Sequence, residues 1–442
     1  MSDPPVLHAV TYEDDFRSYC DPLNRREALD AVKCIPLRRD QNDYLSIGGQ
    51  IRERGEYFDH PSWGQEPPDN GYSLQRYMLH TDLHIGERFR LFTDLASGLE
   101  YGRDGGPRTA IDRDTLFVHQ LFGDVSLWQA NDNSLLLRVG RQEMEFGASR
   151  RVSIREGPNV RQSFDGFRLT WKQGAWTTDF FATKAPLNNP GIFDDPINHA
   201  SSFWGVYATR PLASRHRRNL DLYYLGLDKK KALFASGAVR EQRHSVGARY
   251  WGSEKGWDYD AEGTFQFGRF GPGAIQAWGI ATDTGYTFDS ARLKPRIGVH
   301  AGSASGDHNP NDRDLNTFNA LFPKGAYFSE AELIGPYNVS VVRPSVRFEL
   351  RKNLSLTSDG EFLWRESTRD GIYRVPGVLV RSGFNSHASY IGSQANVELE
   401  WRMRRHFTAT LIYLHFFPGE FLKQSQPARP VNFIAPWITY VF

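Results

Sequence analysis

The chain has 442 residues, with 53 Lys and Arg against 52 Asp and Glu, and aromatic residues make up 14% of it. The balanced charge gives no overall attraction to nucleic acid or to anionic lipid. No apolar run of about 18 residues exists, which excludes a transmembrane helix, and the aromatic content argues against disorder. A soluble protein rich in β-strands remains, or a membrane β-barrel, whose alternating strands keep the average hydropathy low.

Residues 1–42 differ from the rest of the chain and contain both cysteines, Cys20 and Cys34. Clustered cysteines in an otherwise cysteine-free chain fit an oxidising compartment. A disulfide between them would close a loop of about 15 residues, worth about 3 kcal/mol in the chain-entropy model; two unpaired thiols are the alternative. The polar start of the chain has no signal-peptide apolar stretch, so export would imply a leader that has been removed. We expect a short, disulfide-bonded periplasmic segment.

From Tyr44 onward, apolar and polar residues alternate in segments of about ten residues, separated by turn residues. This period of 2 predicts β-strands. The length is typical of membrane strands, which need about 9–11 residues, whereas soluble strands average about 5–6. The predicted strands are 44–56, 74–84, 88–100, 115–126, 134–143, 163–172, 175–183, 202–210, 219–227, 243–251, 257–267, 274–283, 292–301, 339–350, 353–365, 389–401, 406–417 and 431–442. Their number, eighteen, is even, as in bacterial single-chain barrels.

The links between these strands mostly alternate between short and long. Tight links include Gly86-Glu87 and Lys352-Asn353. The long links are 57–73, 101–114, 144–162, 184–201, 228–242, 302–338, 366–388 and 418–430, whereas 268–273 is short where a long loop is expected. Short periplasmic turns and long extracellular loops are typical of outer-membrane barrels. We therefore predict an all-β fold: a closed antiparallel transmembrane barrel of about 18 strands over residues 43–442, in the bacterial outer membrane, with both termini periplasmic.

Three segments resemble a known family. They are VGRQEMEFGASRRVSIREGPNVRQSFDGFRLTW (139–171), GDHNPNDRDLNTFNALFPKGAYF (306–328) and HFFPGEFLKQSQPARPVNFIAPWITYVF (415–442). Together they resemble the alginate-export family of bacterial outer-membrane β-barrel channels, over roughly residues 45–442. The resemblance implies an eighteen-stranded barrel that passes an anionic polysaccharide or small solutes by diffusion. Residues 1–42 lie outside it.

The predicted lumen face is rich in both charges, and its inward acidic positions include Asp82, Asp94, Glu262, Asp359, Glu361 and Glu398. The loop 144–162 follows the third upward strand, where porins commonly fold a loop inward, and Arg binds carboxylates bidentately. The predicted pore-lining residues are Arg52, Arg76, Arg90, Asp94, Arg138, Arg151, Arg155, Arg161, Arg168, Arg249, Arg296 and Arg347. If the loop folds inward, seven of these arginines outweigh Asp94, Glu145 and Glu156, which predicts a mild anion preference. Alternatively the loop is solvated outside the cell, or the charges merely neutralise one another.

No other chemistry is predicted from the motifs. The segment Asp307, Asn309, Asn311, Asp312 and Asp314 invites a calcium interpretation, but it lacks the glycine and the bidentate glutamate of an EF-hand loop. No P-loop, HExxH or CxxC pair appears. We therefore predict no metal, no cofactor and no enzymatic activity.

The leading hypothesis is an outer-membrane channel for passive, selective diffusion of anionic polysaccharide or small hydrophilic solutes, since about 16–18 strands leave an aqueous lumen. One alternative is uptake of small organic or aromatic nutrients along Phe92, Phe122 and Tyr224. A barrel-wall hydrolase and a structural barrel with a blocked lumen are further alternatives. The expected partners are the outer-membrane bilayer and a small-molecule or oligosaccharide substrate, with no nucleic acid; a monomer and a trimer both remain open.

Overall fold

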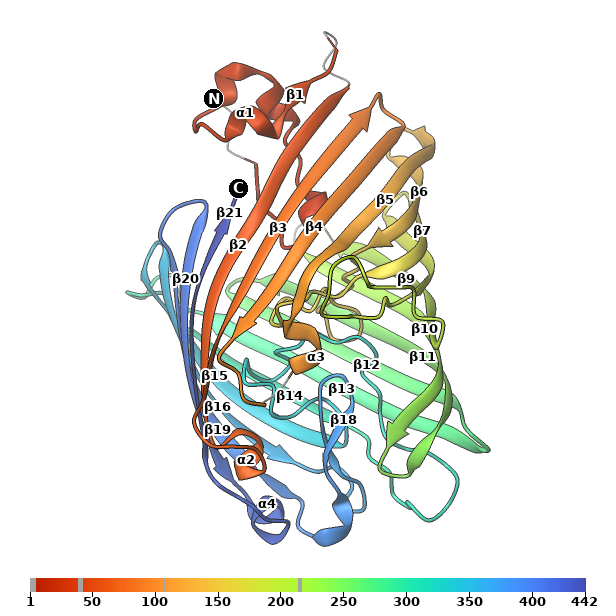
Figure 1. The fold of residues 1–442 in the computed structure, drawn as a ribbon, viewed down its shortest axis with the longest axis vertical. Helices are drawn as coiled ribbons and strands as arrows, with labels where there is room; N and C mark the ends of the chain where they lie inside the picture. The colour runs from red at the N-terminus through yellow and green to blue at the C-terminus, as the bar shows by residue number, and fades with distance from the viewer. Residues whose placement is uncertain (1–4, 39–42, 106–107, 214–216) are drawn as a thin grey trace.

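The computed structural model describes residues 5–38, 43–105, 108–213 and 217–442. Eighteen antiparallel strands form a closed barrel in which the first strand, β2, pairs with the last, β21 (Figure 1). The barrel strands are β2 (Tyr44–Asp59), β3 (Asn70–Ile85), β4 (Phe89–Tyr101), β5 (Asp114–Ala130), β6 (Asn133–Gln142), β7 (Phe164–Gln173), β8 (Trp176–Lys184), β9 (Ser201–Ala213), β10 (Arg218–Phe234), β11 (Gly237–Glu254), β12 (Trp257–Phe270), β13 (Gly273–Thr287), β14 (Arg296–Ala304), β15 (Val339–Arg351), β16 (Leu354–Trp364), β19 (Tyr390–Arg402), β20 (Phe407–Pro418) and β21 (Val431–Val441). Each predicted strand overlaps one of these, so the predicted fold class is confirmed.

The two ends of the barrel differ. One end, here the turn end, carries the short links and both chain termini (Figure 1). Its tightest turns are two residues long; Lys255 and Gly256 have φ of 51° and 85°, the left-handed pair that a type I′ hairpin requires. The opposite end, here the loop end, carries the long links. These contain α2 (Pro61–Gly64), α3 (Thr109–Asp112), α4 (Glu420–Gln424), the 3₁₀ turn η4 (Gly383–Asn385) and the hairpin of β17 (Ile372–Arg374) and β18 (Val378–Arg381).

One predicted long link is wrong. Strand β10 continues to Phe234 and β11 begins at Gly237, so residues 228–242 form a strand hairpin instead of a loop. Charged residues interrupt the apolar pattern here, at 228–231 and 240–241, and Arg240 pairs with Asp228 at 2.6 Å. Strands that extend beyond the bilayer into water need no apolar face, so the alternation that marks membrane strands is lost there. The short link at 268–273 is confirmed, because only two residues separate β12 from β13.

Side chains alternate between the lumen and the outer surface of the wall. On β2, Arg52 and Arg54 are buried, whereas the neighbouring residue Ile51 is 39% exposed. Large apolar side chains stay exposed on the outer face, for example Leu79, Ile280 and Ile297, which is the pattern of a lipid-facing band. Within the described ranges, no helix is both long and apolar enough to cross a membrane.

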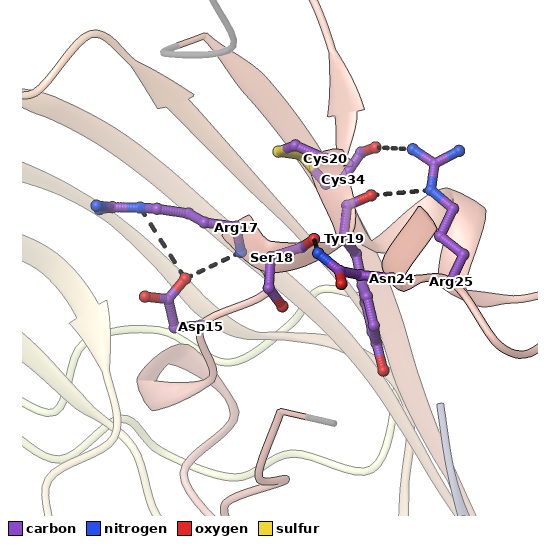
Figure 2. Close-up of a disulfide and its surroundings, with 8 residues drawn as sticks. All are labelled: Asp15, Arg17, Ser18, Tyr19, Cys20, Asn24, Arg25 and Cys34. Carbon is purple, nitrogen blue, oxygen red and sulfur yellow. Dashed lines mark hydrogen bonds and ion pairs between the residues drawn. A yellow bond between two sulfur atoms is a disulfide. The ribbon is translucent and has the colours of Figure 1, made fainter. Parts of the chain in front are cut away.

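The N-terminal segment packs at the turn end beside the C-terminus (Figure 1). It contains η1 (Thr11–Glu13), η2 (Arg17–Cys20), η3 (Pro22–Asn24), α1 (Asp30–Lys33) and β1 (Ile35–Pro36), which pairs with the start of β2. Cys20 and Cys34 form a disulfide, with their Cα atoms 4.9 Å apart. Figure 2 shows Arg25 donating to the carbonyl oxygens of Tyr19 and Cys34 at 2.8 and 3.1 Å. These bonds hold together a segment too small to build a core of its own.

Candidate functional site

Two long loops fold into the lumen and partition it. These inner loops are residues 143–163 and 305–338. They pair with each other through Val152 and Phe322, and the amide of Phe322 donates to the carbonyl of Arg151 at 2.9 Å. The wall holds both loops: Arg52 donates to the carbonyl of Glu156 at 2.8 Å, and Arg343 to that of Phe328 at 2.8 Å. The first inner loop therefore lies inside the barrel, in keeping with one of the two positions considered from the sequence.

The predicted arginines lie on this lumen surface, and carboxylates pair with most of them. The ion pairs are Arg90–Asp82 (2.7 Å), Arg138–Asp124 (2.8 Å), Arg168–Asp179 (2.7 Å), Arg249–Asp221 (2.9 Å), Arg296–Asp258 (2.5 Å), Arg161–Glu143 (2.8 Å), and Arg52 and Arg76 with Glu156. Arg151 donates to the hydroxyl of Thr264 at 3.0 Å, with Glu262 3.9 Å away. Arg347 is exposed near the turn end, and Asp94 is buried with neither oxygen hydrogen-bonded.

The excess of positive charge that the sequence predicted for the lumen around the first inner loop is wrong. The prediction set seven arginines against three carboxylates and left out Asp124, Asp179 and Glu143, which pair with Arg138, Arg168 and Arg161. A signal for part of this existed in the sequence, because Arg138 and Asp124 lie directly opposite each other across the β5–β6 hairpin. Paired charges of this kind give little net field, so any anion preference has to come from arginines without carboxylate partners.

Arg155 is such an arginine. Its side chain is buried, its Nε has no hydrogen-bond partner, and it joins none of the ion pairs among the described residues. Burial lowers the pKa of Arg155, and the nearby Glu332 carboxylate and Tyr337 hydroxyl oppose this only in part. Because a buried charge is costly without a counter-charge, this guanidinium favours an incoming anion.

Arg155 lines a hollow at the loop end. The hollow has a volume of about 270 Å³, and its charged lining consists of Arg141, Arg155, Arg161 and Asp195. Arg141 is bound to Asp165 at 2.8 Å. The lining thus brings three guanidiniums together with one carboxylate, and one of the three carries an uncompensated charge.

A second hollow, of about 450 Å³, lies toward the turn end on the wall of β11 to β16. It mixes both signs of charge: Arg150, Lys324 and Arg343 face Asp258, Asp260 and Asp283 across it. Arg150 binds Asp260 at 2.6 Å and Glu262 at 3.0 Å. Burial lowers the pKa of Lys324, and the neighbouring positive charges of Arg150 and Arg343 lower it further. This hollow therefore suits hydrated solutes of either charge.

Residues 9–14, here the N-terminal insert, occupy the opposite wall of the turn end. Tyr12 is buried with its ring against Phe92 and Phe122, at centroid distances of 6.2 and 5.4 Å. Its hydroxyl donates to the carbonyl of Glu143 at 3.0 Å, and the Arg138 guanidinium lies 3.9 Å from its ring centroid. The insert thus contacts the wall and the first inner loop together.

Arg161 joins the insert to the loop-end hollow. Its Nη2 donates to the carbonyl of Ala9 at 2.6 Å, while the same side chain lines the hollow. The N-terminal insert therefore lies directly behind Arg161 on the turn side, across the direct route from that hollow to the turn end.

The structure does not support two further interpretations of the sequence, the aromatic path through Tyr224 and the calcium interpretation of the acidic segment. Tyr224 lies on the outer face, bonded to His244 at 2.7 Å, because the inward positions of β10 are Asp221, Tyr223 and Leu225. The proposed aromatic path therefore loses Tyr224, and Tyr12 covers the rest of it. In the acidic segment considered for calcium, Asp312 and Asp314 accept backbone amide hydrogen bonds, at 2.9 and 2.8 Å, so these carboxylates stabilise the loop.

The closed barrel, its apolar outer band and its charged, loop-filled lumen define an outer-membrane β-barrel channel. The chain belongs to the alginate export family, whose model matches residues 43–434, as the resemblance in the sequence indicated. A search of curated protein sequences found no match.

Solved structures share the fold at low identity. OpdK from Pseudomonas aeruginosa has a TM-score of 0.60 and 11% identity, covering 90% of this chain and 98% of its own. OccAB2 from Acinetobacter baumannii gives the same TM-score, identity and coverage. OccK2 from P. aeruginosa, solved in complex with glucuronate, has a TM-score of 0.58 and 10% identity over 90% of this chain and 96% of its own. OpdK has also been solved with vanillate. At these identities the likeness concerns the fold alone.

Proposed function

We propose that the protein is a passive channel that selects small carboxylate-bearing solutes as they enter from the loop end. The observation that carries this proposal is the unpaired, buried Arg155 in the loop-end hollow, beside Arg161. In a narrow passage walled by protein, a charge acts more strongly than in bulk water. A carboxylate would supply the counter-charge that Arg155 lacks, and Arg can bind it bidentately.

The size of the hollows favours small solutes over a polysaccharide chain. Their volumes, about 270 and 450 Å³, lie at or below the lower part of the roughly 300–1,000 Å³ range of small-molecule sites. The inner loops line both hollows, and the N-terminal insert lies on the turn side of the loop-end hollow, so a polymer would need both to move. Glucuronate and vanillate, the ligands of the solved barrels OccK2 and OpdK, each carry one carboxylate, which agrees with the proposed class of solute.

We place the loop end outside the cell and the turn end, with both termini and the disulfide-bonded segment, in the periplasm. Barrels of this kind have short periplasmic turns and long extracellular loops, and the disulfide fits an oxidising compartment. The exposed apolar band then faces the bilayer. In this orientation, Arg155 and Arg161 meet solutes entering from outside, which supports uptake over export.

Reversal potentials across a planar bilayer in a salt gradient test the proposal. We expect anion selectivity in the parent protein, and we expect it to weaken near 1 M salt, where the screening length falls to about 3 Å. Arg155→Ser should reduce it. Arg240→Ser is the matched control, because Arg240 is exposed at the loop end and paired with Asp228. Cation selectivity of the parent, or equal effects of both substitutions, would contradict the proposal.

Uptake into proteoliposomes then identifies the solute. Glucuronate and vanillate should enter faster than glucose, and Arg155→Ser should remove most of this advantage. Equal rates for all three would show a general pore, and selective entry of alginate oligomers would favour the polysaccharide alternative. We propose no catalysis; turnover of ester substrates by the purified barrel would favour the hydrolase alternative instead.

A further inference from the structure

Three aspartates meet at the loop end, and one of them, Asp195, also lines the loop-end hollow. Residues 190–193 pack against the start of β5, where the amide of Leu116 donates to the carbonyl of Gly191 at 3.2 Å. The amide of Phe193 donates back to the carbonyl of Leu116 at 2.8 Å. This two-way pairing carries Asp194 and Asp195 to Asp114, the first residue of β5.

One carboxylate oxygen from each aspartate lies within 4.8 Å of the other two. Asp114 is completely buried, and neither of its oxygens has a hydrogen-bond partner. The neighbouring guanidinium of Arg141 does not neutralise the cluster. It binds the Asp165 carboxylate at 2.8 Å and donates to the backbone carbonyl of Asp195 at 3.0 Å. The cluster therefore holds a buried carboxylate beside two more, which is unfavourable unless a proton or a cation lies between them.

We propose that Asp114, Asp194 and Asp195 bind a calcium ion. Calcium takes oxygen ligands at about 2.3–2.6 Å, so two ligands on opposite sides of it lie about 4.6–5.2 Å apart. The three oxygens all lie within 4.8 Å of one another, close enough for one calcium ion to contact all of them. Water can complete the usual six to eight ligands, because Asp194 is exposed.

The ligand set distinguishes calcium from other ions. Zinc sites in proteins are built with His or Cys, and the cluster contains neither. Magnesium requires a stricter octahedron at about 2.0–2.1 Å, with opposite ligands about 4.2 Å apart. Three aspartates from a strand end and a loop suit the more flexible shell of calcium.

Calcium here would fix the loop of residues 185–200 to the barrel rim. Asp195 also lines the loop-end hollow, so an ion on its carboxylate would offset the only negative charge in that lining. This consequence rests on the proposed function, whereas calcium binding itself does not.

Calorimetric titration of the full-length protein in detergent, first depleted of metal with a chelator, tests the site. We expect one site for CaCl2 with a dissociation constant on the order of 10⁻⁴–10⁻³ M, as in extracellular calcium modules. Asp114→Asn and Asp194→Asn should each weaken binding at least tenfold. Asp132→Asn is the matched control, because Asp132 is exposed in the turn at the opposite end of β5 and should leave binding unchanged.

Heat-modifiable migration on SDS gels checks that each variant forms a barrel. If Asp114→Asn does not fold, Asp194→Asn decides the matter, because its exposed side chain has no part in the core. Absence of binding by the parent at millimolar CaCl2 would overturn the proposal, as would unchanged binding by the folded cluster variants. Reversal potentials of Asp194→Asn with and without calcium then test the link to the hollow separately.

Discussion

Replacing Tyr12 by alanine should release the N-terminal insert from the lumen. The substitution removes a buried ring that packs on Phe92 and Phe122 and lies 3.9 Å from the Arg138 guanidinium. Truncating a buried aromatic side chain to alanine costs about 3–5 kcal/mol. A change of about 1.4 kcal/mol alters an equilibrium constant tenfold. Even the lower figure therefore lowers the equilibrium constant for docking of the insert by about a hundredfold. Two bonds from the wall and the first inner loop remain, because Arg161 donates to the carbonyl of Ala9 at 2.6 Å and Arg90 to the backbone carbonyl of residue 12 at 2.7 Å.

Tyr12→Phe is the matched control for this experiment. It keeps the ring and loses only the hydroxyl, with its bonds to the Glu143 carbonyl at 3.0 Å and from Arg168 at 3.3 Å. A hydrogen bond contributes about 1 kcal/mol net, so losing both should weaken docking by roughly thirtyfold, at about 1.4 kcal/mol per tenfold. Single-channel recordings should show larger or more frequent openings in the order parent, Tyr12→Phe, Tyr12→Ala. Equal conductance and open time for all three would refute the argument that the insert obstructs the pore.

Three further predictions concern the inner loops and the disulfide. The double substitution Arg155→Ser with Arg161→Ser should raise conductance and weaken anion preference while the barrel stays heat-modifiable; an unchanged reversal potential would reject the role of these arginines. Burial raises the pKa of Glu332 from 4.5 to about 7, although Arg108 opposes the shift. The neutral carboxyl therefore contributes its full stability below pH 4.5, and this contribution is lost as the pH rises through about 7. Glu332→Gln should therefore raise the unfolding temperature relative to the parent at pH 8 and not at pH 4, and an equal effect at both would contradict this. Thiol titration in denaturant without reductant should find no reactive thiols, and Cys20→Ser with Cys34→Ser should loosen the N-terminal segment by up to about 3 kcal/mol, measured as faster proteolysis before Tyr44.

The barrel was predictable because the bilayer imposes one rule on every strand. Each crossing segment needs an apolar outer face, and the period of 2 displays it. The rule fails where strands leave the bilayer, as at Asp228 and Arg240, and there the sequence suggested a loop. The inward position of Tyr224 was wrong for a related reason: an apolar or aromatic side chain suits both faces, so composition alone does not set the phase of β10.

The site was less predictable, because it depends on contacts between distant segments. Alternation places Arg138 and Arg168 on the inner face, and hairpin register would have paired Arg138 with Asp124. No local pattern indicates that Tyr12 reaches Glu143, 131 residues away. The isolation of Arg155 emerges only once the two inner loops are packed together, since a charge count cannot tell paired from unpaired guanidiniums.

The pairing of β2 with β21 has a consequence for biogenesis. Until the last strand is made, β2 is an open edge whose backbone groups have no partner on one side, the kind of edge that invites aggregation. The wall that receives Tyr12, formed by β4, β5, β6 and β7, is complete long before that point. A curved, unclosed sheet of the first strands can therefore capture the N-terminal insert early. Closure then traps it within a continuous ring of hydrogen bonds, which the bond from the amide of Gly49 to the carbonyl of Phe442, at 3.0 Å, helps to complete.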